Sequence, residues 1–212
     1  VSESLAQVVV SYFGSIVSLL LLAFTLFVLT AIRGIETNSN SIHRHLVLCL
    51  LLAEFIFLVA LRIRSTLVQK EFGCKMTAIS LQYLFMCLFS WSCVQSIHLY
   101  RMLTEIRDIN HGPMKFYYFI GYVIPAIIVG LTVGVRADQY GNYIFCWLSI
   151  YESVVWSLVA PICIAIIVNL VVFLLALQAS VQIKETVSDY GNLKTLLWLS
   201  IILLPLLGSV WI

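Results

Sequence analysis

Residues 8–32 read VVVSYFGSIVSLLLLAFTLFVLTAI and contain no charged side chain. An apolar run of about 18 residues or more is long enough to cross the hydrocarbon core of a bilayer as an α-helix. Because the run is apolar on all sides, it favours a helix surrounded by lipid or by other helices rather than an amphipathic helix on a soluble domain. The stretch therefore indicates a membrane protein.

The rest of the chain repeats this pattern in five further apolar runs, each with at most one charged residue. The whole chain is 62% hydrophobic and 10% charged, whereas a soluble domain has about 45–50% apolar and about 25% charged residues. Strands of a membrane barrel would be about ten residues long with alternating polarity, which these runs do not show. We predict one all-α membrane domain over residues 1–212, with helices at about 8–32, 43–62, 75–101, 115–135, 153–180 and 194–212.

The charges in the loops orient the chain. Seven Lys and Arg residues lie on the side that holds residues 33–44, 101–115 and 184–194, and five lie on the amino-terminal side. Since cytoplasmic loops carry the excess of basic residues, this difference favours an extracellular amino terminus.

The cysteines bear on the same question. Only Cys74 and Cys146 lie in loops, and both loops are on the amino-terminal side. A disulfide between them would place that side in an oxidising compartment; two free surface thiols are the alternative. Inside the apolar runs, thiols are typical packing residues, and these are Cys49, Cys87, Cys93 and Cys163.

The sequence shows no pattern typical of an enzyme. It contains no metal-spaced His/Cys cluster, no glycine-rich phosphate loop and no nucleophile with a base beside it. The net charge of +2 is too small to indicate a nucleic-acid partner. We therefore expect no catalysis, no cofactor, no metal and no nucleic acid.

A few polar groups lie inside the runs. Glu54 is the acidic one, and the cost of an ionisable group in lipid favours a polar contact in the bundle interior, or else a position from which it reaches outer water. Gln95 and His98 lie near the inner end of the third run, where hydrogen bonds across helices serve packing and switching equally well. On the inner side, residues 101–108 and 184–189 carry mixed charges that suit a protein partner or a solvated loop.

Aromatic residues and prolines add two expectations. Tyr117 and Tyr118 open the fourth run, where aromatic side chains often form a belt at the membrane interface. Trp91 lies in the middle of a run and cannot belong to such a belt. Pro125 and Pro161 interrupt the fourth and fifth runs and predict kinks.

Residues 89–161 carry an ordered series of motifs that resembles the adhesion class of G-protein-coupled receptors. The series is closest in pattern to the Flamingo branch, the cadherin–EGF–laminin-G seven-pass receptors. The latrophilin branch shares some of the pieces but matches less well around Tyr100 and Ser149. The motifs are Phe89-Ser90-Trp91, His98-Leu99-Tyr100-Arg101-Met102, Gly112–Tyr118, Tyr140-Gly141-Asn142, Phe145–Tyr151 and Trp156-Ser157.

The resemblance implies a seven-transmembrane bundle in the plasma membrane with the amino-terminal side extracellular. Leu207–Trp211 resembles the sixth-helix segment that carries the family's toggle tryptophan, so the bundle is expected to be truncated within helix six, with helix seven absent. The resemblance also favours the disulfide between Cys74 and Cys146. It implies a pocket for a tethered peptide agonist from upstream in the same protein, lined by Leu81, Phe85, Trp147, Trp156 and Trp211.

Two further expectations follow from the resemblance. One is an inner face that admits a heterotrimeric G protein at Arg44, Arg101, Arg107 and Lys184. The other is a polar network of His43, Glu54, Gln95 and His98. Receptors of this broad class often carry Glu at the position of Gln95, and because Gln cannot ionise, a charged contact with His43 is lost here.

The leading hypothesis also includes adhesion through an ectodomain, which the resemblance places upstream. It further includes a homophilic partner of that ectodomain and a role in planar cell polarity. The alternatives are a latrophilin-like or secretin-like receptor and a non-signalling membrane anchor for an adhesion ectodomain. A transporter or channel is a weaker alternative, since the two halves show no repeat and only one acid lies within a run.

Overall fold

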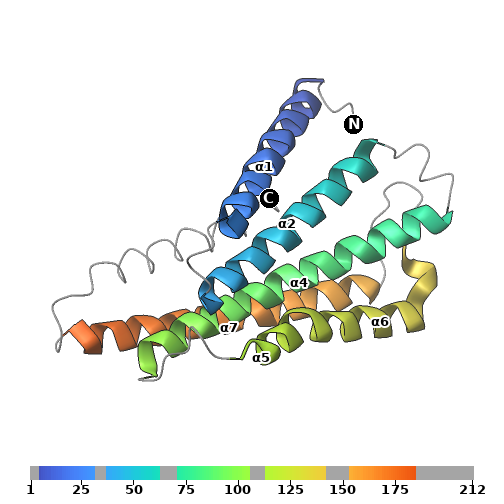
Figure 1. The fold of residues 1–212 in the computed structure, drawn as a ribbon. Coiled ribbons are helices and arrows are strands. Elements are labelled where there is room, and N and C mark those ends of the chain that lie inside the picture. Colours follow the sequence, from blue (N-terminus) through green and yellow to red (C-terminus); the bar gives the residue numbers. More distant parts are fainter. Residues whose placement is uncertain (1–4, 32–36, 63–70, 106–112, 142–152, 185–212) are drawn as a thin grey trace.

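The computed structural model describes residues 5–31, 37–62, 71–105, 113–141 and 153–184, all of them helices or the short connections between helices (Figure 1). The prediction of an all-α membrane protein is confirmed, and the expected helix at 194–212 lies outside the described residues. The elements are α1 (Leu5–Ala31), α2 (Asn38–Arg62), α4 (Glu71–Thr104), α5 (Lys115–Tyr118), the π-helical turn η1 (Phe119–Val123), α6 (Ile124–Arg136), the 3-10 turns η2 (Ala137–Gln139) and η3 (Ser153–Val155), and α7 (Trp156–Lys184).

Five helical spans in the described residues are long and apolar enough to cross a membrane. α2 begins at Asn38, earlier than the apolar pattern predicts, because Thr37 supplies a helix cap. The Thr37 hydroxyl accepts a hydrogen bond from the backbone N–H of Asn40 at 3.3 Å, which satisfies one of the free donors of the first turn. The helix therefore starts in polar sequence, one turn before the lipid core.

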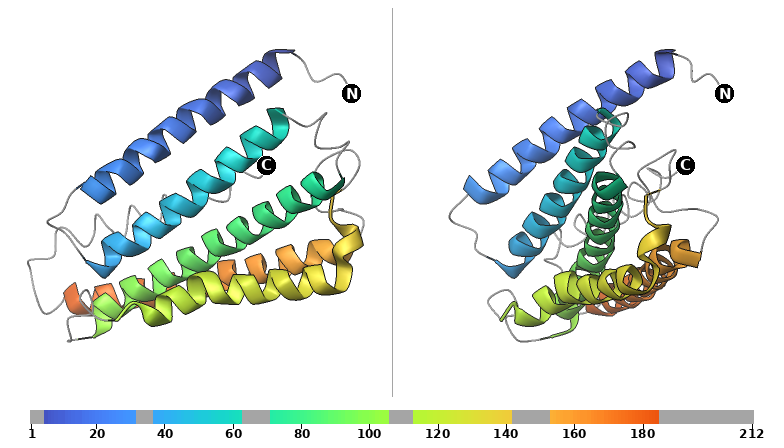
Figure 2. Two further views of the ribbon diagram at one scale, coloured as in Figure 1. Left: turned by 45° about the vertical axis from the view of Figure 1, so that its right-hand side comes forward. Right: turned by 90° about the vertical axis from the view of Figure 1, so that its right-hand side faces the viewer.

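The helices run alternately in opposite directions, and α4 crosses the middle of the assembly (Figures 1 and 2). In an 18-residue window of the α4 span, 56% of the residues are buried, whereas none are buried in the corresponding window of α1. α4 packs against α2, α6, η1 and α7, and α1 packs against α2. α4 is thus the scaffold from which polar side chains at both ends of the bundle are placed. We call the end where α1 finishes and α2 begins the inner end, and the opposite end the outer end.

Two buried clusters fill the space around α4. The inner cluster joins α2, α4 and α5 through Ile42, Leu46, Cys49, Cys87, Leu88, Trp91, Val94 and Tyr117. The outer cluster joins α4, α6 and α7 through Ala78, Met86, Val129, Tyr140, Val154 and Leu158. Large apolar side chains on the far faces of α1, α6 and α7 are exposed, for example Phe24, Leu131 and Ile164. Exposure of this kind is stable only if lipid or further apolar helices cover these faces.

The π-helical turn η1 ends two residues before Pro125, which has no N–H to donate to the carbonyl of Gly121. The backbone N–H of Ile124 bonds instead to the carbonyl of Phe119, five residues back. Such a wider turn is typical of a π-bulge. It brings Gly121 against the buried indole of Trp91, where a Cβ atom would lie 2.5 Å from Cε2 of the ring. Only glycine fits this approach.

Tyr117 does not belong to an interfacial belt. Its side chain is 3% exposed and lies in the inner cluster, whereas Tyr118 beside it is 40% exposed. The two residues are adjacent in the sequence but point about 100° apart around the helix, so one enters the bundle and the other meets the interface.

Candidate functional site

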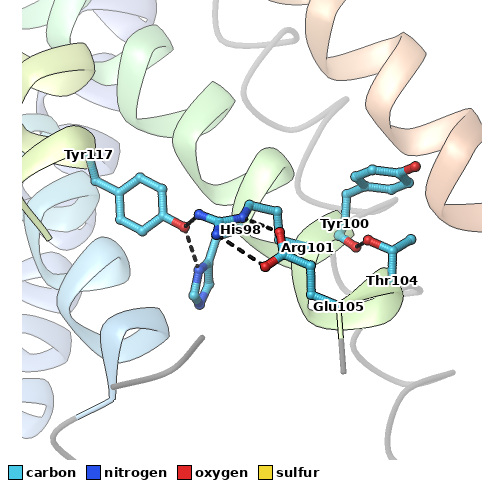
Figure 3. A network of polar contacts seen from close by, with 6 residues as sticks. All are labelled: His98, Tyr100, Arg101, Thr104, Glu105 and Tyr117. Carbon is cyan, nitrogen blue, oxygen red and sulfur yellow. Dashed lines mark hydrogen bonds and ion pairs between the residues drawn. The ribbon is translucent and has the colours of Figure 1, made fainter. Parts of the chain in front are cut away.

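The inner end of α4 carries a connected polar group, drawn in Figure 3. Arg101 Nε and Nη2 donate to the two carboxylate oxygens of Glu105 at 2.7 and 3.2 Å. Its remaining nitrogen, Nη1, donates to the hydroxyl of Tyr117 at 3.1 Å. His98 Nδ1 lies 3.1 Å from the same hydroxyl. The last turn of α4 and the first turn of α5 are therefore joined through one tyrosine oxygen.

The direction of these hydrogen bonds follows from the chemistry of the groups. Arginine can only donate, so the oxygen of Tyr117 accepts from Arg101. The hydroxyl hydrogen of Tyr117 is then available to His98 Nδ1. Tyr117 and His98 are 3% and 2% exposed, so water cannot replace either bond at low cost. These two hydrogen bonds in series fix one edge of the guanidinium group of Arg101.

His43 and Gln95 meet at the same end, on α2 and α4. His43 Nδ1 lies 2.8 Å from the carbonyl oxygen of Ser39, which can only accept, so Nδ1 carries the proton. Nε2 is then the acceptor, and it lies 3.1 Å from the amide nitrogen of Gln95. A neutral histidine thus satisfies both contacts, and the pair is a neutral hydrogen bond between the two helices.

Glu54 and His98 do not join the pair of His43 and Gln95 through any hydrogen bond among the described residues. Glu54 accepts a hydrogen bond from the hydroxyl of Ser18 on α1 at 3.0 Å. It lies eleven residues after His43, about 16 Å along the helix. Among the described residues, the hydrogen bonds of these four residues thus link His43 to Gln95, Glu54 to Ser18 and His98 to Tyr117.

The basic residues expected to face a G protein have different surroundings. Arg44 is half-buried and donates to the carbonyl of Leu29 in the last turn of α1 at 3.2 Å, a contact that favours the helix terminus. Lys184 is the last residue of α7. Arg107 lies outside the described residues. Arg101 is the one whose surroundings are best defined, and a G-protein contact for all four stays a prediction.

A second polar group lies at the outer end. Gln82 is fully buried on α4; its carbonyl accepts from the Tyr140 hydroxyl at 2.6 Å and its amide donates to Ser157 at 2.9 Å. Burial raises the pKa of Tyr140 above its ordinary value, so the hydroxyl keeps its proton and donates. Gln82 thereby connects three segments: α4, the chain after α6 and the first turn of α7.

The expected agonist pocket is described only in part. Leu81 is 2% exposed on α4, and Phe85, one turn later, packs against the outer cluster. Trp156 at the start of α7 is 66% exposed. Trp147 and Trp211 lie outside the described residues. Leu81 and Phe85 flank Gln82 on the same buried stretch of α4, and the pocket itself stays a prediction.

Gly141 brings the chain after α6 back to the start of α4. Its φ of 83° lies in the left-handed region, which glycine adopts without strain. A Cβ atom there would lie 3.3 Å from the backbone nitrogen of Lys75 and 3.6 Å from the carbonyl carbon of Cys74. Cys74 is 3% exposed. Cys146 lies outside the described residues, so its disulfide with Cys74 stays a prediction.

Several polar residues at helix contacts were missed by the sequence analysis. Asn169 on α7 is 4% exposed; it accepts from Ser96 at 2.8 Å and donates to Ser92 at 3.1 Å, which ties α7 to α4. His45 stacks on Trp91 with ring centroids 4.8 Å apart, and its two nitrogens lie within 3.2 Å of tyrosine hydroxyls. Glu54 was singled out because it is a polar residue inside an apolar run. The same signal would have identified Asn169 and Gln82.

The contact between Glu54 and Ser18 leads to a modest prediction. We expect Ser18→Ala to destabilise the fold by about 0.6 kcal/mol, the average for a hydrogen bond between membrane helices. Glu54→Gln keeps an acceptor for Ser18, so we expect it to lower the stability of the fold by less than Glu54→Leu does. Thermal unfolding of the purified chain in lipid nanodiscs measures the difference. Equal loss in Glu54→Gln and Glu54→Leu would show that the hydrogen bond is irrelevant.

Comparison with known proteins agrees with the geometry. Residues 4–212 match the family described as 7 transmembrane receptor (Secretin family). The chain is 52% identical over 209 residues to the Protocadherin-like wing polarity protein stan of Drosophila melanogaster. It is 39% identical over 210 residues to the human Cadherin EGF LAG seven-pass G-type receptor 1, and 35% identical over 207 residues to the bovine Adhesion G protein-coupled receptor L1.

These alignments cover 99%, 99% and 96% of the chain but only 6%, 7% and 14% of the three relatives. The chain thus corresponds to a small part of each relative, the membrane-spanning receptor core. Five membrane-length helices and the family match make it a multi-pass protein of the plasma membrane. The chain belongs to the secretin family of seven-transmembrane receptors, and within that family to the adhesion receptors of the Flamingo type.

Proposed function

We propose that this chain is the signalling core of an adhesion receptor, which couples a tethered peptide agonist and cell–cell adhesion on the outside to a heterotrimeric G protein on the inside. Two named relatives are G-type or G protein-coupled receptors, and another is a wing polarity protein. The proposal extends these properties to the present chain. The agonist and the adhesive ectodomain would precede the core in the complete protein.

The observation that carries the proposal is the arrangement at the inner end of α4. The side chain of Arg101 is 38% exposed, yet one edge of its guanidinium is fixed by buried Tyr117. A cation that is both oriented and accessible suits recognition of a protein partner. His43 and Gln95 join α2 to α4 nearby, and their single neutral hydrogen bond can break when the helices separate.

The outer end supports an agonist site. Leu81 and Phe85 are apolar, and they lie on a stretch of α4 that Gln82 ties to Tyr140 and Ser157. Apolar walls with a few oriented polar groups are typical of ligand sites. An agonist here would act on the inner end by binding one arrangement of α4 and α7 better than the other, and the contacts of Asn169 with Ser92 and Ser96 join those two helices midway.

A non-signalling anchor is the second candidate. It is favoured by the neutral pair of His43 and Gln95. Breaking a neutral hydrogen bond changes the free-energy difference between two receptor states by less than breaking an ion pair would. In that case, the core would hold an adhesive ectodomain in the membrane, and an agonist peptide would have no effect inside the cell.

The test uses the full-length receptor at the cell surface and a synthetic peptide that copies the segment directly upstream of Val1. We expect the peptide to raise nucleotide exchange on at least one class of heterotrimeric G protein. A peptide of the same composition in scrambled order is the control. Good surface expression with no response to the peptide across all G-protein classes would support the anchor and exclude the signalling core.

A further inference from the structure

Arg101 uses its three nitrogens in two different ways. Nε and Nη2 form a side-on pair with the carboxylate of Glu105 at 2.7 and 3.2 Å, the geometry in which arginine binds a carboxylate best. Nη1 faces the opposite direction and bonds to Tyr117. The side of the guanidinium that recognises carboxylates is therefore separate from the side that holds it in place.

The two sides differ in their exposure. Tyr117 is 3% exposed, and its hydroxyl also meets the buried His98, so this attachment persists as long as the helices stay packed. The carboxylate side is open, since the side chains of Arg101 and Glu105 are 38% and 40% exposed. In Figure 3, Glu105 lies at the very end of the helix, on the side of Arg101 away from Tyr117. Because water screens this exposed pair, it contributes less to stability than a buried pair of the same geometry would.

Two features make Glu105 an unusually weak partner. Arginine comes first and the acid four residues later, which is the less favourable order for a helical ion pair. Glu105 directly follows Thr104, the last residue of α4. The backbone N–H of Glu105 still donates to the backbone carbonyl of Arg101. A negative charge at the carboxyl end of a helix is opposed by the helix dipole. A carboxylate from outside would not carry the first of these penalties, because it is not bound to a fixed position on the same helix.

We propose that Arg101 is a preformed receptor for a carboxylate of the cytoplasmic partner, and that Glu105 occupies this receptor until an acidic segment of the partner replaces it. The inference rests on the proposed coupling to a G protein, and it names the recognition chemistry at that interface. Tyr117 is a positioning residue: it keeps the guanidinium oriented while the carboxylates exchange. The partner segment is an acidic peptide.

The test uses the full-length receptor in lipid nanodiscs and two fluorescent probes, acetyl-(Asp-Glu)4-amide and its uncharged counterpart acetyl-(Asn-Gln)4-amide. We expect only the acidic probe to bind. Glu105→Gln should bind it about twofold more tightly, because competition is removed, and Arg101→Gln at least about tenfold more weakly. Lys115→Gln is the matched control, since Lys115 is an exposed base at the same end of the bundle.

The double exchange Arg101→Glu with Glu105→Arg separates recognition from structure. It restores an ion pair in the order that a helix prefers, so a merely structural role predicts full activity. The proposal predicts instead no binding of the acidic probe and loss of G-protein response. Tyr117→Phe should weaken probe binding several-fold, and the neutral double variant Arg101→Gln with Glu105→Gln decides the matter if the exchanged protein does not reach the membrane.

The outcomes also separate this inference from the proposed function. If the acidic probe requires Arg101 but no G protein responds to the wild-type receptor, the carboxylate receptor stands and the signalling role fails. If G-protein response is the same in the wild type and in the exchanged variant, the inference is overturned while signalling stands. Equal losses in Arg101→Gln and Lys115→Gln would mean that general positive charge attracts the probe, which also overturns the inference.

Discussion

Gly121→Ala is expected to destabilise the protein by about 1–3 kcal/mol, the usual cost of adding a methyl group to a filled core. The added Cβ would lie 2.5 Å from Cε2, 2.7 Å from Nε1 and 2.8 Å from Cζ2 of Trp91. These atoms belong to a rigid ring that is 0% exposed and stacked on His45, so the ring cannot move aside. Either η1 must shift away from α4 or the inner cluster must open.

The measurement is thermal unfolding followed with a thiol-reactive dye, which reports unfolding because Cys49 and Cys87 are buried. Gly130→Ala is the matched control: it lies in the same span, and its added Cβ would meet nothing within 4 Å. Since alanine is the better helix former by about 1 kcal/mol, this control should be neutral or stabilising. Equal behaviour of the two variants would contradict the contact with Trp91.

Gln82→Leu should have the second large effect, because it leaves the hydroxyl of Tyr140 buried without its acceptor. Tyr140 is 1% exposed and Gln82 0% exposed, and an unpaired buried polar group costs about 1–3 kcal/mol. Ser157 keeps its bond to the carbonyl of Val154 at 2.7 Å, so Tyr140 carries most of the loss. Unfolding of the variant in nanodiscs should show a lower midpoint and earlier loosening of the chain after α6.

The double variant Gln82→Leu with Tyr140→Phe provides the control. Replacing both partners of a buried hydrogen bond by apolar groups is close to neutral, so the second change should rescue much of the stability lost in the first. The difference between the double variant and the sum of the single ones gives the coupling of the pair. Additive losses would show that the bond of 2.6 Å contributes nothing specific.

The sequence was sufficient for the fold class, because uncharged runs of this length have few uses other than crossing a membrane. The receptor family was indicated by the resemblance of the ordered motifs in residues 89–161. It was less informative about helix ends. α4 extends beyond the predicted 75–101 to Glu71–Thr104, since charged residues such as Lys75 and Arg101 can lie on helical turns that project out of the lipid. Apolar runs show where the lipid core is, and the helix continues as long as its backbone is satisfied.

The site was predictable in its residue types but not in its pairings. Arg101, His98 and Gln95 were expected at the inner end, yet Tyr117, which joins two of them, was assigned to the interfacial belt. In a run that is apolar on all sides, periodicity does not reveal which face is buried, so neighbouring tyrosines cannot be told apart. The pairing of Gln82 with Tyr140 depends on a return of the chain after α6 that local sequence does not encode.

The π-helical turn at Phe119–Val123 divides the fourth span into two halves that are rotated relative to each other about the helix axis. One extra residue in a turn rotates everything beyond it by about 100° relative to a continuous α-helix. The half before the turn therefore presents Tyr117 to the inner cluster, and the half after it presents Val129 to the outer cluster. Deleting a single residue here would keep the span's length and hydropathy nearly unchanged, yet it would turn one half of the helix toward lipid.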